Sequence, residues 1–282
     1  MNNVSYVLYV GQHDIHRLAK SDHIYGPGSR SFLKRYANIK AGMQVLDMGC
    51  GTGNMSLWMA EQVGPAGEVY GVDASAEQIE IAKSRADALG VKNVTFVQLD
   101  FSKISLLGRQ FDIVYCRFFL IHLCTPLEAI KFMVSATKKD GVVVCEEPIT
   151  DLHECSPEHE AFSCANSLTV SLGQALGVDY NLGYRLHELF TAALLDDIEL
   201  TYNQPGINDE NDRGIFYDSF SQIANPLLDL RLTTPEQINT ICEQLLNLRT
   251  DLTYSIKGFR IIQAIGSPHS SSKEFIYERP HK

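Results

Sequence analysis

Between residues 43 and 147, short apolar runs rich in β-branched residues alternate with longer segments whose apolar residues recur every three or four positions. Side chains repeat every two residues in a strand and every 3.6 residues in a helix, so the short runs predict strands and the longer segments predict helices. Strands are expected at 43–48, 68–73, 94–99, 111–116 and 141–147. Helices are expected between them at 55–63, 76–89 and 127–139. This alternation predicts a doubly wound α/β fold.

After residue 147 helical segments predominate, and two more strands are expected at 197–204 and 259–266, which gives a seven-stranded, Rossmann-like sheet. We interpret residues 1–40 as a helical N-terminal extension and residues 41–282 as one α/β domain. Insertions at about 151–182 and 209–257 would then lie over the strand ends as a helical lid. The amphipathic segment 235–252 predicts a lid helix or a dimer helix, so a homodimer is compatible with the sequence.

Composition and charge limit the molecules that the protein is expected to bind and the compartment in which it is expected. The chain has 34 acidic and 24 basic residues and a net charge of −10, which repels phosphate backbones and disfavours a nucleic-acid substrate. No stretch approaches the roughly 18 apolar residues of a membrane span, and the N-terminus lacks the pattern of a secretory leader. Seven scattered cysteines without a CxxC pair indicate reduced thiols. We therefore expect a cytoplasmic protein without a membrane partner.

Three glycines, Gly49, Gly51 and Gly53, follow the first predicted strand in the stretch VLDMGCGTGN. A strand that turns directly into a helix exposes free backbone N–H groups, and glycine removes the Cβ atoms that would hold a ligand away. Asp73 stands at the end of the next strand, 20 residues after Gly53. An acid at this position accepts hydrogen bonds from ribose hydroxyls, although an Asp there also serves as a helix cap. Together these features favour a ligand of the nucleotide type.

The glycine spacing separates two kinds of nucleotide ligand. A nicotinamide or flavin site uses G-x-G-x-x-G, whereas here the order is G-x-G-x-G, with Asn54 where that pattern has its third glycine. Asp47 precedes the first glycine, and a carboxylate at a strand tip favours a cationic ligand such as the sulfonium and ammonium of S-adenosylmethionine. An NAD-dependent dehydrogenase remains the alternative enzyme. A non-catalytic binding module on the same fold is the second alternative.

Four motifs in order, VLDMGCGTG, GEVYGVDAS, FVQLDF and FDIVYCRFFLIHL, resemble those of class I S-adenosylmethionine-dependent methyltransferases. The resemblance spans residues 43–147, and the rest of the chain is most similar to the small-molecule branch that includes ubiquinone and menaquinone biosynthesis enzymes. It implies S-adenosyl-L-methionine as cofactor and methyl transfer to a small organic molecule. Whether oxygen, nitrogen or carbon is the nucleophile stays open.

The resemblance also implies roles for individual residues. The methionine part of the cofactor would lie against the glycine turn, the ribose on an acid, the adenine on two further segments, and the ammonium or carboxylate near the end of the fourth strand. For the methionine part these residues are Asp47, Gly49, Cys50, Gly51 and Gly53, and for the ribose the residue is Asp73. For the adenine they are Ala74, Gln78, Asp100 and Phe101. For the ammonium or the carboxylate they are Cys116, through its carbonyl, and Arg117. Structural alternatives stand beside these roles. Asp100 is equally a turn residue and Phe101 a core residue, Cys116 a small hydrophobe and Arg117 the partner of a nearby acid.

Methyl transfer from a sulfonium is an in-line displacement, and the protein mainly aligns the reactants and excludes water. A base is needed only for a poorly acidic nucleophile. His122, Glu146 and Glu147 are the candidate bases. His122 follows the fourth strand, and the two glutamates end the fifth strand, at the rim where a substrate would enter. Alternatively, His122 is a packed residue, and the two glutamates form caps or ion pairs.

Two further groups of residues are candidates for a metal site and for a substrate pocket. Histidines and acids in HDIH and DLHECSPEH supply too few ligands close together, so no metal site is expected. Aromatic residues outside the four motifs either line an apolar pocket or dock helices on the core. They are Tyr6, Tyr9, Tyr25, Tyr180, Tyr184, Phe190 and Phe216.

Overall fold

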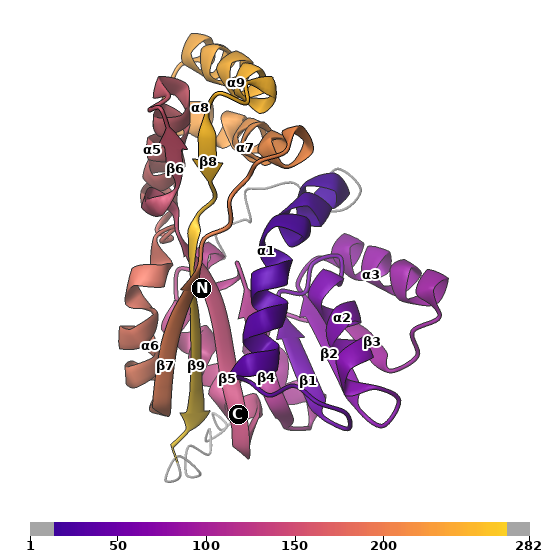
Figure 1. Cartoon of the computed structure of the whole chain (residues 1–282). Helices are drawn as coiled ribbons and strands as arrows, with labels where there is room; N and C mark the ends of the chain where they lie inside the picture. The colour runs from indigo at the N-terminus through magenta and orange to yellow at the C-terminus, as the bar shows by residue number, and fades with distance from the viewer. Residues whose placement is uncertain (1–13, 270–282) are drawn as a thin grey trace.

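Seven strands form one sheet in the order β3-β2-β1-β4-β5-β9-β7, as Figure 1 shows. This computed structural model describes residues 14–269. The strands are β1 Gln44–Met48, β2 Glu68–Asp73, β3 Val94–Gln98, β4 Phe111–Arg117, β5 Thr137–Ile149, β7 Leu195–Asn203 and β9 Arg260–Pro268. Strands β1 to β5 are parallel, whereas β9 runs antiparallel to β5 and β7 antiparallel to β9. The predicted doubly wound, seven-stranded α/β sheet is confirmed.

Helices cover both faces of the sheet. On one face lie α1 Ile15–Arg35, α2 Asn54–Val63 and α3 Ala76–Leu89, and on the other lie α4 Pro126–Ala136 and α6 Leu186–Ala192. Successive side chains of a strand point to opposite faces, so β1 buries Val45 against α1 and α2 while Leu46 and Met48 pack toward α4. The central strands β1 and β4 are thus buried on both sides, whereas the edge strand β7 is largely exposed.

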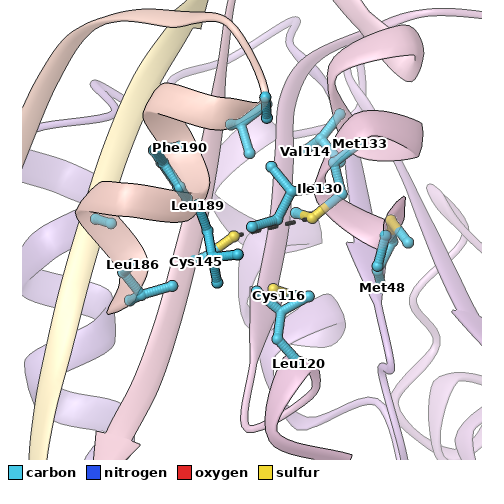
Figure 2. Packing of buried hydrophobic residues seen from close by; sticks show 14 of the residues in the cluster. Met48, Val114, Cys116, Leu120, Ile130, Met133, Cys145, Leu186, Leu189 and Phe190 are labelled. Carbon is cyan, nitrogen blue, oxygen red and sulfur yellow. Dashed lines mark hydrogen bonds between the residues drawn. The ribbon is translucent and has the colours of Figure 1, made fainter. Parts of the chain in front are cut away.

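The core on the α4 and α6 face is shown in Figure 2. Met48, Cys116 and Cys145 project from the sheet toward Ile130 and Met133 of α4, and α6 closes the cluster with Leu186, Leu189 and Phe190. Phe190 and Cys116 are completely buried there. Both are therefore core residues rather than pocket residues.

The predicted helix at 127–139 ends earlier than expected. Helix α4 ends at Ala136, and Thr137 already pairs with Phe111 of β4. Lys138 then forms an ion pair with Asp112 at 2.9 Å, which draws the lysine segment to the sheet instead of extending the helix. A β-branched residue at the junction favours this change to extended backbone.

The chain between β5 and β9 builds a second group of elements beyond the carboxyl ends of the parallel strands (Figure 1). We call the helices α5 Glu160–Leu176, α7 Glu210–Gln222, α8 Ala224–Asp229 and α9 Pro235–Thr250, with the ribbon of β6 Glu154–Ser156 and β8 Ser255–Lys257, the cap. These elements share an apolar core with Ile24 and Tyr25 of α1. The cap falls within the segments expected as insertions, but its two short strands were not expected. The division into an extension and one domain stays a prediction.

Short 3-10 helices connect these elements, among them η2 Phe101–Leu107, η3 Leu120–His122, η4 Thr150–Leu152 and η5 Leu182–Arg185. None of the helices within residues 14–269 combines the length and the apolar character that a bilayer span requires.

Candidate functional site

A cavity of about 580 Å³ opens between the carboxyl ends of the parallel strands, the first half of α1 and the cap. Such a volume suits a small organic ligand. The sheet side of the wall comes from the loops after β1, β2, β3 and β4, and the cap side comes mainly from α5 and α7.

The glycine turn forms the floor of the cavity beside β1. Gly49, Gly51 and Gly53 have φ values of 70°, 51° and 78°, a conformation that side chains other than glycine rarely adopt. A Cβ on Gly49 would lie 2.6 Å from the Phe119 ring, whereas a Cβ on Gly51 would meet nothing closer than Leu18, at 3.7 Å. Gly51, together with the neighbouring Cys50, therefore presents open backbone to the cavity.

Asp73 holds this turn from the end of β2. Its Oδ2 accepts a hydrogen bond from the Gly51 N–H and its Oδ1 accepts one from the Ser75 N–H, both at 2.9 Å. The N-cap residue of α3 is Ser75, whose hydroxyl accepts a hydrogen bond from the Gln78 N–H, so Asp73 is not the N-cap of this helix. Burial raises the pKa of Asp73. Each carboxylate oxygen keeps a lone pair for a ligand hydroxyl on the cavity side.

Asp47 lies at the end of β1 and lines the same cavity, although only 3% of its surface is exposed. Burial raises its pKa to about 6, against the lowering effects of a hydrogen bond donated by Ser56 and of the Arg117 charge. The site thus contains a carboxylate that would gain from a nearby cation.

Ala74, Gln78, Asp100 and Phe101 lie together on the cavity wall beyond Asp73. Asp100 Oδ1 accepts hydrogen bonds from the backbone N–H and the hydroxyl of Ser102, so this carboxylate also caps η2. Gln78 Oε1 is buried and has no hydrogen-bond partner among the described residues, a polar atom to which a ligand amine could donate.

Arg117 lines the cavity, but its guanidinium is held by α1. It pairs with Asp22 at 2.8 Å and donates to the Ser29 hydroxyl at 3.1 Å. Arg117 is therefore the partner of a nearby acid, as the structural alternative to its cofactor role had it. Cys116 is not among the residues that line the cavity, and its thiol packs in the core on the α4 side of the sheet. The role expected of its carbonyl stays a prediction.

The structure corrects the expectation that Glu146 and Glu147 lie at the rim of the site, since neither lines the cavity. Glu146 is fully buried and accepts hydrogen bonds from Ser29, Tyr115 and Gln263 at 2.8–2.9 Å, which fastens α1 to the sheet. Glu147 points to the other face, where its Oε1 accepts from the Phe119 and Leu120 N–H groups. Burial raises the pKa of Glu147 to about 8. Glu146 therefore holds α1 in place, and Glu147 holds the backbone that follows β4.

His122 does line the cavity, with its ring edge-on to Tyr180 at 6.0 Å. Burial, helped by the charge of Arg17, lowers its pKa to about 3. The imidazole is therefore neutral near pH 7, and its weak basicity speaks against a role as a strong general base.

The aromatic candidates divide between pocket and core. Tyr25, Tyr180 and Phe216 line the cavity, Phe190 packs in the core, Tyr184 is exposed, and Tyr6 and Tyr9 lie outside the described residues. Sequence reasoning missed several lining residues from α1, the cap and the link between β8 and β9: Arg17, Leu18, Ser21, Phe162, Phe220 and Phe259. The helical spacing of Phe162 within α5 was the only available signal for them.

The prediction of no metal site stays a prediction. Within residues 14–269, the possible ligand atoms of His23, Asp209 and Asp212 lie within 4.8 Å of one another, at the contact of α1 with the start of α7. None of these three lines the cavity. His13 lies outside the described residues, and Asp14 is bonded to Arg17 and Gln222.

A family model described as a methyltransferase domain matches residues 39–189, just over half of the chain. The demethylmenaquinone methyltransferase of Geobacillus kaustophilus is 32% identical over 118 residues, which is 42% of this chain and 50% of that protein. The chain thus spans about half the length of the curated relatives it matches.

Solved structures share the fold. The YcgJ protein of Bacillus subtilis superposes with a TM-score of 0.59 at 20% identity, covering 86% of this chain and 99% of that one. The Haemonchus contortus phosphoethanolamine N-methyltransferase 2, in complex with phosphomonomethylethanolamine and S-adenosylhomocysteine, has a TM-score of 0.54 at 17% identity, covering 89% and 57%. At these identities the two structures show the fold alone.

Proposed function

Because the chain belongs to the family of methyltransferase domains, we propose that it binds S-adenosyl-L-methionine at the glycine turn and transfers the methyl group to a small organic molecule. The observation that carries this proposal is the open backbone of Gly51, which Asp73 holds at the floor of a cavity that continues under the cap. The relative from Geobacillus kaustophilus, a demethylmenaquinone methyltransferase, supports an organic acceptor.

In this proposal, different residues of the site bind different parts of the cofactor. Asp73 would accept hydrogen bonds from the ribose hydroxyls, and the turn around Gly51 would lie along the methionine part. The buried Asp47 would stabilise the positive charges, while Gln78, Asp100 and Phe101 would surround the adenine. When bound, S-adenosylmethionine supplies an activated methyl group on a sulfonium.

The remaining residues align the acceptor and exclude water, which is the main requirement of such a displacement. Among the described residues, none on the cap side of the cavity is an acid or a strong base that could remove a proton from the acceptor. The acceptor atom is therefore expected to be a good nucleophile without a strong base.

The net charge of −10 supports a small acceptor rather than a nucleic acid. A homodimer through the exposed side of α9 and a cytoplasmic location stay predictions. Light scattering of the purified protein tests the first of them.

Isothermal titration with S-adenosylhomocysteine and with NAD tests the cofactor. We expect binding of S-adenosylhomocysteine, and Asp73→Ala should weaken it by about 1 to 3 kcal/mol because ligand hydroxyls lose their acceptor. The exposed Asp197→Ala on β7 is the matched control and should leave the affinity unchanged.

Preferential binding of NAD would overturn the proposal in favour of a dehydrogenase. Label transfer from S-adenosyl-L-methionine to a set of phenols, amines, carboxylates and quinones then tests catalysis. Good cofactor affinity without transfer to any acceptor would indicate a binding module.

A further inference from the structure

The cap side of the cavity carries no formal charge. We call the cavity wall contributed by residues 148–259 the cap chamber. None of the described residues that line the cap chamber is Asp, Glu, Lys or Arg. Tyr25 and Phe118 complete the chamber from α1 and the end of β4. A ligand in the chamber thus meets apolar groups and neutral hydrogen-bonding groups.

The charged residues of the cavity lie outside the cap chamber and are engaged elsewhere. Asp47 of β1 and Asp73 of β2 flank the glycine turn, where they face the proposed cofactor, and Asp100 accepts hydrogen bonds from Ser102 at the start of η2. Arg17 is paired with Asp14 at 2.6 Å and Arg117 with Asp22 at 2.8 Å. A charged acceptor would lose its hydration in the chamber without gaining a counter-charge, which is costly.

Aromatic rings dominate the chamber wall. Phe162 meets Phe216 edge-to-face with centroids 4.8 Å apart, and His153 meets Phe162 at 4.4 Å in the same way. Tyr25 lies parallel to Phe259 at 6.4 Å. Such walls bind flat rings by stacking and by edge contacts, in addition to the burial of apolar surface.

His153 is the polar group at the centre of these rings. Its Nδ1 is enclosed by protein, so Nε2 is the nitrogen that a ligand can reach from the cavity. Burial lowers the pKa of His153 to about 4, so the ring is neutral near pH 7. The Nε2 of a neutral imidazole forms one hydrogen bond with a hydroxyl group, either as acceptor or as donor.

We propose that the cap chamber binds an uncharged acceptor that carries a ring and a hydroxyl group, and that His153 orients this acceptor through a hydrogen bond to the hydroxyl. The inference rests on the proposed function, because it names the acceptor class of the same site. His153 is a binding residue in this scheme, and no proton transfer to it is required.

Binding of matched two-ring probes to the protein saturated with S-adenosylhomocysteine tests the acceptor class. We expect 2-naphthol to bind at least about tenfold more tightly than 2-naphthoate or 2-naphthylmethylammonium, because both ions lose hydration. Equal or tighter binding of the carboxylate would overturn the proposal. So would tight binding of the ammonium ion, which would identify the rings as a site for cations.

A comparison of 2-naphthol with naphthalene tests His153. His153→Phe keeps an aromatic ring beside Phe162 but removes the hydrogen bond. We expect the affinity for 2-naphthol to fall about three- to tenfold while that for naphthalene is unchanged. His159→Phe is the matched control, since His159 contacts Tyr254 but does not line the cavity, and it should change neither affinity.

An equal loss for both probes in His153→Phe would mean that His153 only packs, and would overturn its assigned role. Titration of each variant with S-adenosylhomocysteine shows whether the cofactor site is intact. If that compound does not bind the parent protein, the proposed function fails, and the same probe series without it still tests the cap chamber. The comparison of charged and neutral probes needs no variant.

Discussion

Asp47 is a carboxylate that the fold removes from water at the point where a cation is expected. Burial raises its pKa to about 6, and Ser56 and Arg117 only partly offset this effect. A carboxylate in this state binds a proton more readily than an ordinary aspartate does. A cationic ligand would compete with that proton, because both stabilise the same charge.

We therefore predict that the affinity for S-adenosyl-L-methionine falls as the pH is lowered through about 6. Below this pH the free protein holds a proton on Asp47 that binding of the cation must displace. Titration calorimetry between about pH 5 and about pH 8 measures the effect. In Asp47→Asn the dependence should be weaker, and an unchanged pH profile in this variant would exclude Asp47 as its origin.

Glu147 shows the opposite of the usual behaviour of a carboxylate in a folded protein. Burial raises its pKa from 4.5 to about 8, although the N–H groups of Leu120 and Phe119 lower it. Between these two pH values the unfolded chain has released a proton that the folded protein keeps. The contribution of Glu147 to stability is thus complete below about pH 4.5 and is lost as the pH rises to about 8.

Urea unfolding at several pH values tests this contribution. We predict that the free energy of unfolding of the parent protein declines across this window more steeply than that of Glu147→Gln, whose amide remains neutral. Glu128→Gln on the exposed side of α4 is the control and should follow the parent protein. Parallel curves for Glu147→Gln and the parent protein would contradict the assignment of a raised pKa.

The turn between β1 and α2 combines two different demands for glycine. Gly49 is required by packing, since a Cβ there would lie 2.6 Å from Phe119, and Gly53 is similarly confined by Phe96 at 2.7 Å. Gly51 is not confined by packing, because the space beside it is open, and we attribute this glycine to the proposed ligand. All three also have positive φ, which costs an L-residue about 1 to 2 kcal/mol.

We predict that Gly51→Ala lowers the free energy of unfolding by about 1 to 2 kcal/mol and weakens binding of S-adenosylhomocysteine, because its methyl group projects into the ligand space. Gly49→Ala should reduce stability more strongly, since Phe119 must move as well. Urea unfolding and calorimetry on both variants separate the two effects. Binding of S-adenosylhomocysteine to Gly51→Ala with parental affinity would show that the ligand does not approach this glycine.

The elements of the sheet were predictable because each follows from local periodicity. The alternation in 195–203 and the apolar runs that became β1 and β4 were located to within two residues. The short strands β6 and β8 were not predictable, since three residues carry no periodic signal and their pairing joins segments about 100 residues apart. The end of α4 depended on the pairing of Thr137 with Phe111, which is a tertiary contact.

The candidate site was predictable where backbone and spacing define it. Gly51 and Asp73 lie together because parallel strands end at the same edge of the sheet, although the hydrogen bond between them was not predicted. The roles of the two glutamates within β5 could not be predicted, because they depend on partners such as Ser29 and the Phe119 N–H, far away in the sequence. The same holds for His153, whose ring acquires its position only when Phe162 of α5 and Phe259, just before β9, pack against it.

The molecule as a whole brings two chemically different walls to one cavity. The sheet side supplies bare backbone and carboxylates, and the cap supplies neutral aromatic surface. Helix α1 joins them, since it packs on the sheet through Phe32 and Leu33 and meets α7 through an ion pair of Lys20 with Asp218 at 2.5 Å. A cationic cofactor and an uncharged acceptor would therefore meet at the boundary between these walls.

A crystal structure of the protein grown with S-adenosylhomocysteine tests this account most directly. The ribose hydroxyls should lie within hydrogen-bond distance of Asp73, with the amino-acid part along the backbone at Gly51 and the sulfur facing the cap chamber. The compound bound at another surface, or a cavity at Gly51 that stays empty at saturating concentration, would contradict it.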